Sequence, residues 1–238
     1  MKAAQPKAEQ ALVIGVGDGL SASLARLFHK NGIAVSLASR RPENLTALCE
    51  ETDAQAFSCN VSDADSVEQL FTAVDASIGS PDIVVFNPSA RTRGPFIEQD
   101  RDAVKQAILV SCFGGFLVAQ AAAKRMLAQG HGTILFTGAS ASVKGYAQSA
   151  SFAIGKFGLR GLAQSLAREL HPQGIHIGHF VIDGGISSGA NDPRAGRGGG
   201  EDGLLHPDAI AESYLHFHRQ HRSSWAWEIE LRPWVEKF

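Results

Sequence analysis

Two residues four positions apart, Phe152 and Lys156, stand in the segment SASFAIGKFGLRGLAQSLAREL, residues 149–170. Apolar residues recur in this segment at spacings of three and four, which predicts a helix over 150–170. Residues at positions i and i+4 share one face of a helix. Lys156 can donate hydrogen bonds from that face, whereas the ring of Phe152 supplies neither a proton nor a hydrogen bond.

Three glycines, Gly15, Gly17 and Gly19, stand between an apolar run and an amphipathic helical pattern. Gly15 would allow a tight turn, and Gly19 would let a pyrophosphate approach the helix N-terminus, where free N–H groups and the helix dipole favour anions. An ordinary strand–helix turn is the alternative. The context favours a dinucleotide site, for which the candidate residues are Gly15, Gly17, Asp18, Gly19 and Leu20.

Two arginines, Arg40 and Arg41, follow the second apolar run in the sequence LASRR. A site for NAD usually has Asp or Glu here to bind the ribose 2′-hydroxyl. Guanidinium groups instead suit a 2′-phosphate, through paired charge-assisted hydrogen bonds. The sequence therefore favours NADP(H) over NAD(H), unless both arginines are solvated surface residues. Asp18 adds negative charge near the same pocket, or caps the following helix.

Short apolar runs alternate with helical patterns along the whole chain. The predicted strands are 11–15, 33–38, 54–59, 82–87, 132–137, 175–182 and 225–231, and the predicted helices are 20–30, 43–51, 64–77, 100–128, 150–170 and 207–220. This alternation predicts a single doubly wound Rossmann-type α/β domain over 1–238. Its parallel sheet should have about seven strands, with helices on both faces and right-handed crossovers.

One segment interrupts the alternation, SSGANDPRAGRGGGEDG at residues 187–203. It is dense in glycine and cannot bury apolar area, so we expect a mobile loop. Because it follows a predicted strand, we interpret 187–205 as a flexible lid on the substrate side of a site. A tolerated surface insertion is the alternative.

Composition excludes several classes of partner. The chain has 238 residues and a formal net charge of −2, with no dense block of Lys and Arg. Nucleic acid and anionic membrane surfaces are therefore not expected partners. Three scattered cysteines without a CxxC pair fit a reducing cytoplasm. The polar N-terminus and the short apolar run after it favour a first strand over a signal peptide.

Three further features have structural interpretations. The uncharged stretch 106–123 predicts a buried helix, with Gly114 and Gly115 allowing another backbone to approach closely, and not a membrane span. His218 and His221 share a helical face without a Cys or acidic partner, so no metal site is expected. The three tryptophans near the C-terminus predict a last strand and a packed tail: Trp225, Trp227 and Trp234.

Several segments, in this order, resemble motifs of the short-chain dehydrogenase/reductase family over nearly the full length. Residues 15–21 resemble its TGxxxGIG motif, with Ile14 for Thr and Ser21 for the last Gly, and CNVSD at 59–63 resembles the acidic-Val segment at the adenine. NPSA at 87–90 resembles NNAG, and VIDGGISS at 181–188 resembles VxPGxIxT, with Asp183 for Pro. The resemblance implies a nicotinamide cofactor, with Ile186 beside the carboxamide, and these further contacts: Asn60, Val61, Asn87, Gly184, Ile186 and Ser188.

The same resemblance implies a catalytic set that this chain lacks in part. The family uses a Tyr–Lys pair, a Ser thirteen residues before the Tyr, and an Asn on the preceding long helix. Lys156 matches the lysine and would hold the nicotinamide ribose. Phe152, Ala139 and Ser111 stand at the other three positions. A placed general acid typically contributes about 10²–10⁴ in rate, so the substitution of the tyrosine bears directly on activity.

Two side chains could replace the missing proton donor. Ser140 adjoins Ala139, and a one-residue shift of the loop would bring it into the serine's place. Tyr146 precedes Phe152 by six residues and would face the pocket mouth, unless it is a surface aromatic. A water bound to the lysine is a third donor. The candidate catalytic residues are Lys156, Tyr146, Ser140 and Ser111.

Three functions are compatible with these patterns. The first is an NADP(H)-dependent oxidoreductase that transfers a hydride to or from a small carbonyl, alcohol or activated acceptor with an altered proton donor. The second is a catalytically inactive NADP(H)-binding subunit or sensor. The third, a non-redox enzyme, is disfavoured because it would not need the cofactor features. The apolar helices 100–128 and 150–170 resemble the family's pairing surfaces and imply a homodimer or homotetramer.

Overall fold

A seven-stranded sheet forms the centre of the computed structural model, which describes residues 8–189, 192–194 and 200–235. The strand order is β3-β2-β1-β4-β5-β6-β7, and every neighbouring pair is parallel. The predicted parallel sheet is therefore confirmed. The strands are β1 (Gln10–Ile14), β2 (Ala34–Ser39), β3 (Gln55–Ser58), β4 (Ile83–Phe86), β5 (Gly132–Thr137), β6 (Ile175–Ile182) and β7 (Glu228–Leu231).

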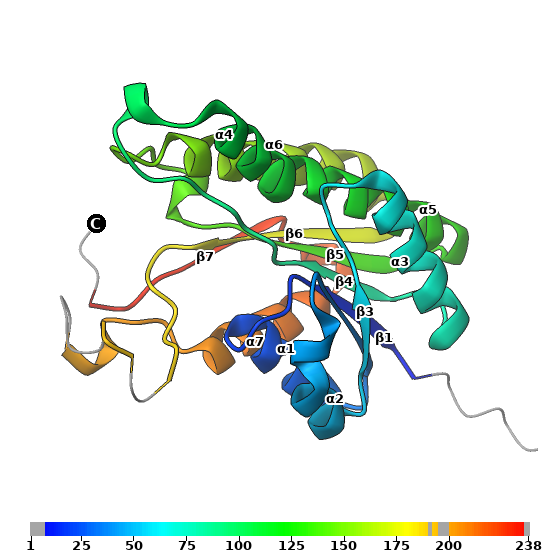
Figure 1. Cartoon of the computed structure of the whole chain (residues 1–238). Coiled ribbons are helices and arrows are strands. Elements are labelled where there is room, and N and C mark those ends of the chain that lie inside the picture. The colour runs from blue at the N-terminus through cyan, green and yellow to red at the C-terminus, as the bar shows by residue number, and fades with distance from the viewer. Residues whose placement is uncertain (1–7, 190–191, 195–199, 236–238) are drawn as a thin grey trace, which may run out of the picture.

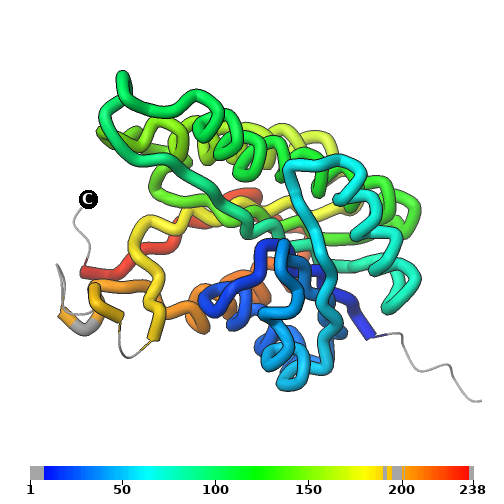
Figure 2. Tube along the Cα trace, in the orientation of Figure 1, coloured from blue at the N-terminus to red at the C-terminus, as the bar shows by residue number. Residues whose placement is uncertain are grey.

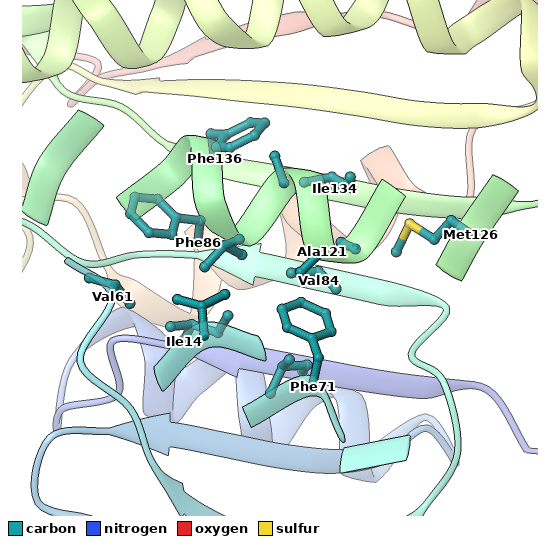
Figure 3. Close-up of a cluster of buried hydrophobic side chains, with 14 of the residues drawn as sticks. Ile14, Val61, Phe71, Val84, Phe86, Ala121, Met126, Ile134 and Phe136 are labelled. Carbon is teal, nitrogen blue, oxygen red and sulfur yellow. The ribbon is translucent and has the colours of Figure 1, made fainter. Parts of the chain in front are cut away.

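Helices cover both faces of the sheet, as predicted (Figure 1). One face carries α1 (Leu20–Lys30), α2 (Thr46–Thr52) and α7 (Pro207–His218). The other carries α3 (Ala64–Ser77), α4 (Arg101–Ile108), α5 (Gly114–Gln129) and α6 (Ala150–Leu170). A separate hydrophobic cluster fills each side, and Figure 3 shows the one under α3 and α5, where Phe71, Phe86, Met126 and Phe136 are fully buried.

The long apolar helix predicted over 100–128 is confirmed as one continuous helix over 101–129. A π-helical turn, Leu109–Phe113, lies between its two α-helical parts, α4 and α5. The glycines that begin α5 do allow close approach, because a Cβ on Gly114 would lie 2.8 Å from the carbonyl oxygen of Val61. The stretch 101–129 is long and apolar enough to span a membrane, but Val118 and Met126 are fully buried under the sheet, as in a core helix.

Other boundaries differ for local reasons. The helix predicted over 43–51 begins as a 3₁₀ turn, Pro42–Leu45, before α2. The last strand begins at Glu228 because Trp225 precedes it in a connection and stacks on the ring of His176, with 4.4 Å between centroids. The prediction of a packed tail is wrong for Trp234, which is 81% exposed and donates a hydrogen bond to Asp202.

The chain segments after each strand meet at one edge of the sheet. Because all strands are parallel, their carboxyl ends point the same way, and the trace in Figure 2 shows the segments that follow β4, β6 and β7 gathered on that side. The strand order reverses between β1 and β4. Ligands of open α/β sheets bind outside the carboxyl ends of the strands at such a switch point.

Candidate functional site

The glycine segment turns tightly after β1. Gly15 has φ +82°, and a Cβ there would lie 2.7 Å from the backbone nitrogen of Pro88, so only glycine fits. Its N–H donates to the carbonyl of Ala38 at the end of β2 (2.9 Å). The turn therefore lies across the carboxyl ends of β1, β2 and β4.

The N-terminus of α1 presents an open cradle. A Cβ built on Gly17 or Gly19 would meet nothing within 4 Å. Gly19 is the N-cap, no side chain caps the helix, and no acidic residue lies in its first turn. Free N–H groups and open space together fit a phosphate group. The alternative that Asp18 caps this helix is wrong, because its exposed side chain makes no capping bond.

Ser21 links the glycine turn to β4, a role that sequence reasoning missed. Its hydroxyl donates to the carbonyl of Gly15 (3.2 Å) and accepts from the side-chain amide of Asn87 (2.6 Å). Ser21 is buried, and Leu20 beside it packs into the core. Asn87 therefore positions the turn through Ser21.

Polar groups without partners lie at the ends of β2 and β3. Arg40 and Arg41 are exposed, and neither guanidinium group makes a hydrogen bond or an ion pair with another described residue. Asn60 is exposed and accepts from the hydroxyl of Ser62 through its side-chain oxygen (2.8 Å), and its amide N–H groups bond to no described residue. Val61 is buried. The exposed groups can bind the phosphate and base ends of a nucleotide.

Lys156 extends from α6 to the carboxyl end of β5. Its Nζ donates to the carbonyl of Thr137 (2.7 Å), and the side chain is buried. Burial lowers the pKa of the amine to about 8. The amine lies 5.9 Å from the centroid of the Phe152 ring. The predicted helix thus brings Phe152 and Lys156 together on one face.

Arg91, which sequence reasoning did not single out, contacts the ring of Phe152. Its guanidinium carbon lies 5.4 Å from the centroid of the Phe152 ring. Arg91 follows β4 in the segment NPSAR, and no periodic pattern marks it. Only the fold brings the two residues together.

The turn after β5 contains the predicted serine position. Ala139 precedes a 3₁₀ turn, Ser140–Ser142, and its N–H donates to the Ser142 hydroxyl (3.1 Å). Ser142 lies 3.3 Å from Nε2 of His179 on β6, and both side chains are fully buried. Ser140 is partly buried, and its hydroxyl has no hydrogen-bond partner among the described residues. Of the two hydroxyls, that of Ser140 is free for a ligand.

Ser111 and Tyr146 differ in their availability. Ser111 lies in the π-helical turn, fully buried, and its hydroxyl both accepts from the N–H of Ala90 (2.9 Å) and donates to its carbonyl (3.0 Å). Tyr146 is 49% exposed on the turn before α6, and its hydroxyl bonds to no described residue. Ser111 thus positions the loop after β4, whereas Tyr146 keeps a free hydroxyl.

The segment after β6 closes against the C-terminal residues. Asp183 accepts from Lys144 (2.9 Å) and pairs with Arg232 (3.1 Å). A Cβ on Gly184 would lie 2.7 Å from Pro233. Ile186 forms an isolated parallel bridge with Leu205. Lys144, from the turn after β5, is thereby tied to the end of β6.

The predicted lid over 187–205 lies only partly within the described residues, since 190–191 and 195–199 fall outside them. In the described part, Asp192 accepts from the N–H of Ser188 (2.8 Å) and pairs with Arg194 (2.7 Å). Those bonds hold the pKa of the Asp192 carboxyl well below its usual range. The flexibility of the lid stays a prediction.

His218 and His221 both have structural partners. Nδ1 of His218 lies 2.9 Å from the hydroxyl of Thr133, and Nδ1 of His221 lies 2.8 Å from that of Ser223. Within the part of the chain that the structure describes, no three His, Cys, Asp or Glu side chains form a metal-ligand group.

Comparison with known proteins agrees with this geometry. A family model described as short chain dehydrogenase matches residues 9–194. The D-threitol dehydrogenase of Mycolicibacterium smegmatis is 28% identical over 172 residues, which are 70% of this chain and 66%, just under two thirds, of that protein.

Solved structures match over most of the chain. A short-chain dehydrogenase from Rhodopseudomonas palustris has a TM-score of 0.82 at 32% identity, covering 96% of this chain and 100% of its own. A metagenomic short-chain oxidoreductase in complex with NADP has a TM-score of 0.81 at 26% identity, covering 94% and 97%. With the family model matching most of its length, the chain belongs to the short-chain dehydrogenase family.

Proposed function

We propose that the chain binds NADP(H) along the carboxyl edge of its sheet and is an oxidoreductase acting on a small carbonyl compound or alcohol. The observation that carries the proposal is the buried amine of Lys156, bonded to the end of β5 at the edge where the glycine turn lies. A buried lysine is costly unless the amine has a partner or a ligand. The nicotinamide group, when bound, supplies or accepts the hydride.

Preference for NADP(H) over NAD(H) is supported by Arg40 and Arg41. Both guanidinium groups are exposed at the end of β2 without ion pairs to described residues. The metagenomic relative was solved with NADP. We expect the double substitution Arg40→Ala, Arg41→Ala to weaken binding of NADPH about 10- to 100-fold and to leave the affinity for NADH nearly unchanged.

Titration of NADPH by its fluorescence tests the binding half of the proposal. Lys156→Met should weaken NADPH binding about 10-fold, by loss of one charge-assisted hydrogen bond. Lys124→Met, an exposed residue of α5, serves as the control and should have no effect. Absence of NADPH and NADH binding in the unchanged protein would contradict the proposal.

Turnover tests the second half. NADPH consumption is followed with ketones, enones and imines, then with Tyr146→Phe and Ser140→Ala. The hydroxyls of Tyr146 and Ser140 bond to no described residue, so each is available to a substrate. Loss of turnover in one of the two variants identifies the hydroxyl removed there as the proton donor. Cofactor binding with no turnover on any substrate favours the alternative, a non-catalytic NADP(H)-binding subunit.

We also propose that the chain pairs with a second copy through the outer face of α5 and α6. Phe113 and Phe116 stack with 6.0 Å between centroids, and Ile154 and Phe157 are exposed on the adjacent helix. Grouped exposed apolar side chains typically mark an interface. Phe116→Asp with Phe157→Asp should yield a monomer by light scattering, whereas Trp234→Ser should not.

A further inference from the structure

The loop after β4 carries a guanidinium group that no described residue neutralises. Arg91 is exposed, and no hydrogen bond or ion pair joins it to another described residue. Its guanidinium carbon lies 5.4 Å from the centroid of the Phe152 ring, within the range of a cation–π contact. Five N–H donors are therefore held beside this ring and are available to a ligand.

Two buried hydroxyls fix the backbone on either side of Arg91. Ser111 Oγ accepts from the N–H of Ala90 and donates to its carbonyl. Ser151 Oγ accepts from the N–H of Thr92 (2.9 Å) and donates to its carbonyl (3.2 Å). Both serines are fully buried. Because Ser151 lies in the first turn of α6, the loop is fixed relative to that helix.

Two cationic groups, those of Arg91 and Lys156, approach the Phe152 ring. Lys156 approaches the same ring, with Nζ 5.9 Å from the centroid. Neither Phe152 nor Ala139 has a hydroxyl to offer. Such donors bind a carboxylate more strongly than a neutral carbonyl, because both partners are then charged, and the planar fork of arginine binds a carboxylate through two parallel hydrogen bonds.

We propose that Arg91 binds a carboxylate of the substrate, so that the substrate class is a carbonyl acid. This inference rests on the proposed function, since the carbonyl group would lie beside Lys156 while Arg91 holds the acid group. Arg91 binds and orients, and no bond to it forms or breaks. Phe152 holds the guanidinium in place through its ring face.

Arg93 provides a matched control. It lies two residues further along the same loop, is exposed, and has the same charge. No ring contact, hydrogen bond or ion pair joins it to the described residues. A general electrostatic effect would be equal for Arg91→Gln and Arg93→Gln, whereas a carboxylate site depends on Arg91 alone.

Calorimetry on protein saturated with NADP⁺ measures the binding of benzoylformate and of its methyl ester, which lacks the charge. We expect the acid to bind more tightly than the ester. Arg91→Gln should weaken binding of the acid about 10- to 100-fold and leave the affinity for the ester unchanged. Arg91→Lys should restore part of the affinity for the acid, and Phe152→Leu should weaken binding of the acid several-fold.

Three outcomes overturn the inference: no benzoylformate binding to the unchanged protein, equal binding of acid and ester, or equal effects of Arg91→Gln and Arg93→Gln. An NADPH titration of every variant separates this failure from failure of the proposed function. If NADPH binds normally and Arg91→Gln leaves the affinity for benzoylformate unchanged, only the proposal of a carboxylate site is overturned. Loss of NADPH binding in the unchanged protein removes both.

Discussion

Lys156 is the residue at which local burial determines chemistry. Loss of hydration lowers the pKa of its amine to about 8, so the group is largely protonated at neutral pH and loses its charge in mild alkali. A protonated amine donates stronger hydrogen bonds than a neutral one. Any ligand oxygen held by Lys156 should therefore bind less tightly as pH rises through 8.

The first prediction follows from that titration. NADPH affinity should fall about 10-fold between pH 7 and pH 9.5, because the charge-assisted bond from Lys156 weakens as the proton leaves. In Lys156→Met the affinity should start lower and stay level over the same range. Fluorescence titrations across the range measure both curves. Parallel slopes in the two proteins would show that another group is responsible.

The second prediction concerns the missing hydroxyls. Phe152→Tyr combined with Ala139→Ser should raise the rate of ketone reduction by about 10²–10⁴, because a placed general acid contributes that much. Phe152→Leu, which removes the ring without adding a hydroxyl, should give no gain. Steady-state rates at saturating NADPH compare the three. No gain in the double variant would mean that the pocket does not bring a carbonyl oxygen to residue 152.

At the scale of elements, the site depends on how α6 meets the loop after β4. Ser151 joins them, with its hydroxyl bonded to both backbone groups of Thr92. The two residues are 59 positions apart in sequence. Because these bonds are partly buried, with Ser151 itself fully buried, their loss leaves backbone groups without these partners.

The third prediction tests that junction. Ser151→Ala should lower the free energy of unfolding by about 1–3 kcal/mol, the cost of leaving polar groups unpaired in a partly buried site. Ser149→Ala, two residues earlier, should cost little, since the Ser149 hydroxyl makes no capping bond. Urea denaturation measures both. A similar loss for the two variants would mean that the junction does not depend on Ser151.

The sequence predicts what depends on local pattern. Strands and most helices follow from apolar spacing, and the glycine turn and Lys156 follow from motifs within one strand–helix unit. The π-helical turn at Leu109–Phe113 does not, because it holds Ser111, whose hydroxyl bonds to Ala90, 21 residues away. Arg91 was missed for the same reason: its contact with Phe152 exists only once α6 packs on the loop.

At the scale of the whole molecule, a chain of polar groups connects the turn after β5 to β7, across β6. Arg160 on α6 pairs with Glu228 of β7 (2.7 Å), which bonds to Nδ1 of His179 (3.0 Å). Nε2 of His179 faces Ser142 beneath the turn at Ala139. Burial lowers the pKa of His179 to about 4, although Glu228 opposes the shift. This histidine is therefore neutral at pH 7.

His176 is buried in the same way, stacked between Phe217 and Trp225, and burial lowers its pKa to about 4 as well. Both folded values lie below the unfolded value of 6.5, so the unfolded chain binds more protons between those limits. The contribution of each histidine to the free energy of unfolding is fully present above pH 6.5. It is lost as pH drops toward 4, and the loss is about 3 kcal/mol for each histidine.

The fourth prediction is that His176→Phe flattens this acid dependence. Phenylalanine keeps the stack and cannot take a proton, so the loss of stability between pH 6.5 and pH 4 should shrink by about 3 kcal/mol. His216→Gln, an exposed residue of α7, should leave the slope as it is. Urea midpoints at a series of pH values compare the three proteins. An unchanged slope in His176→Phe would show that acid unfolding is driven by other groups, with His179 then the next to substitute.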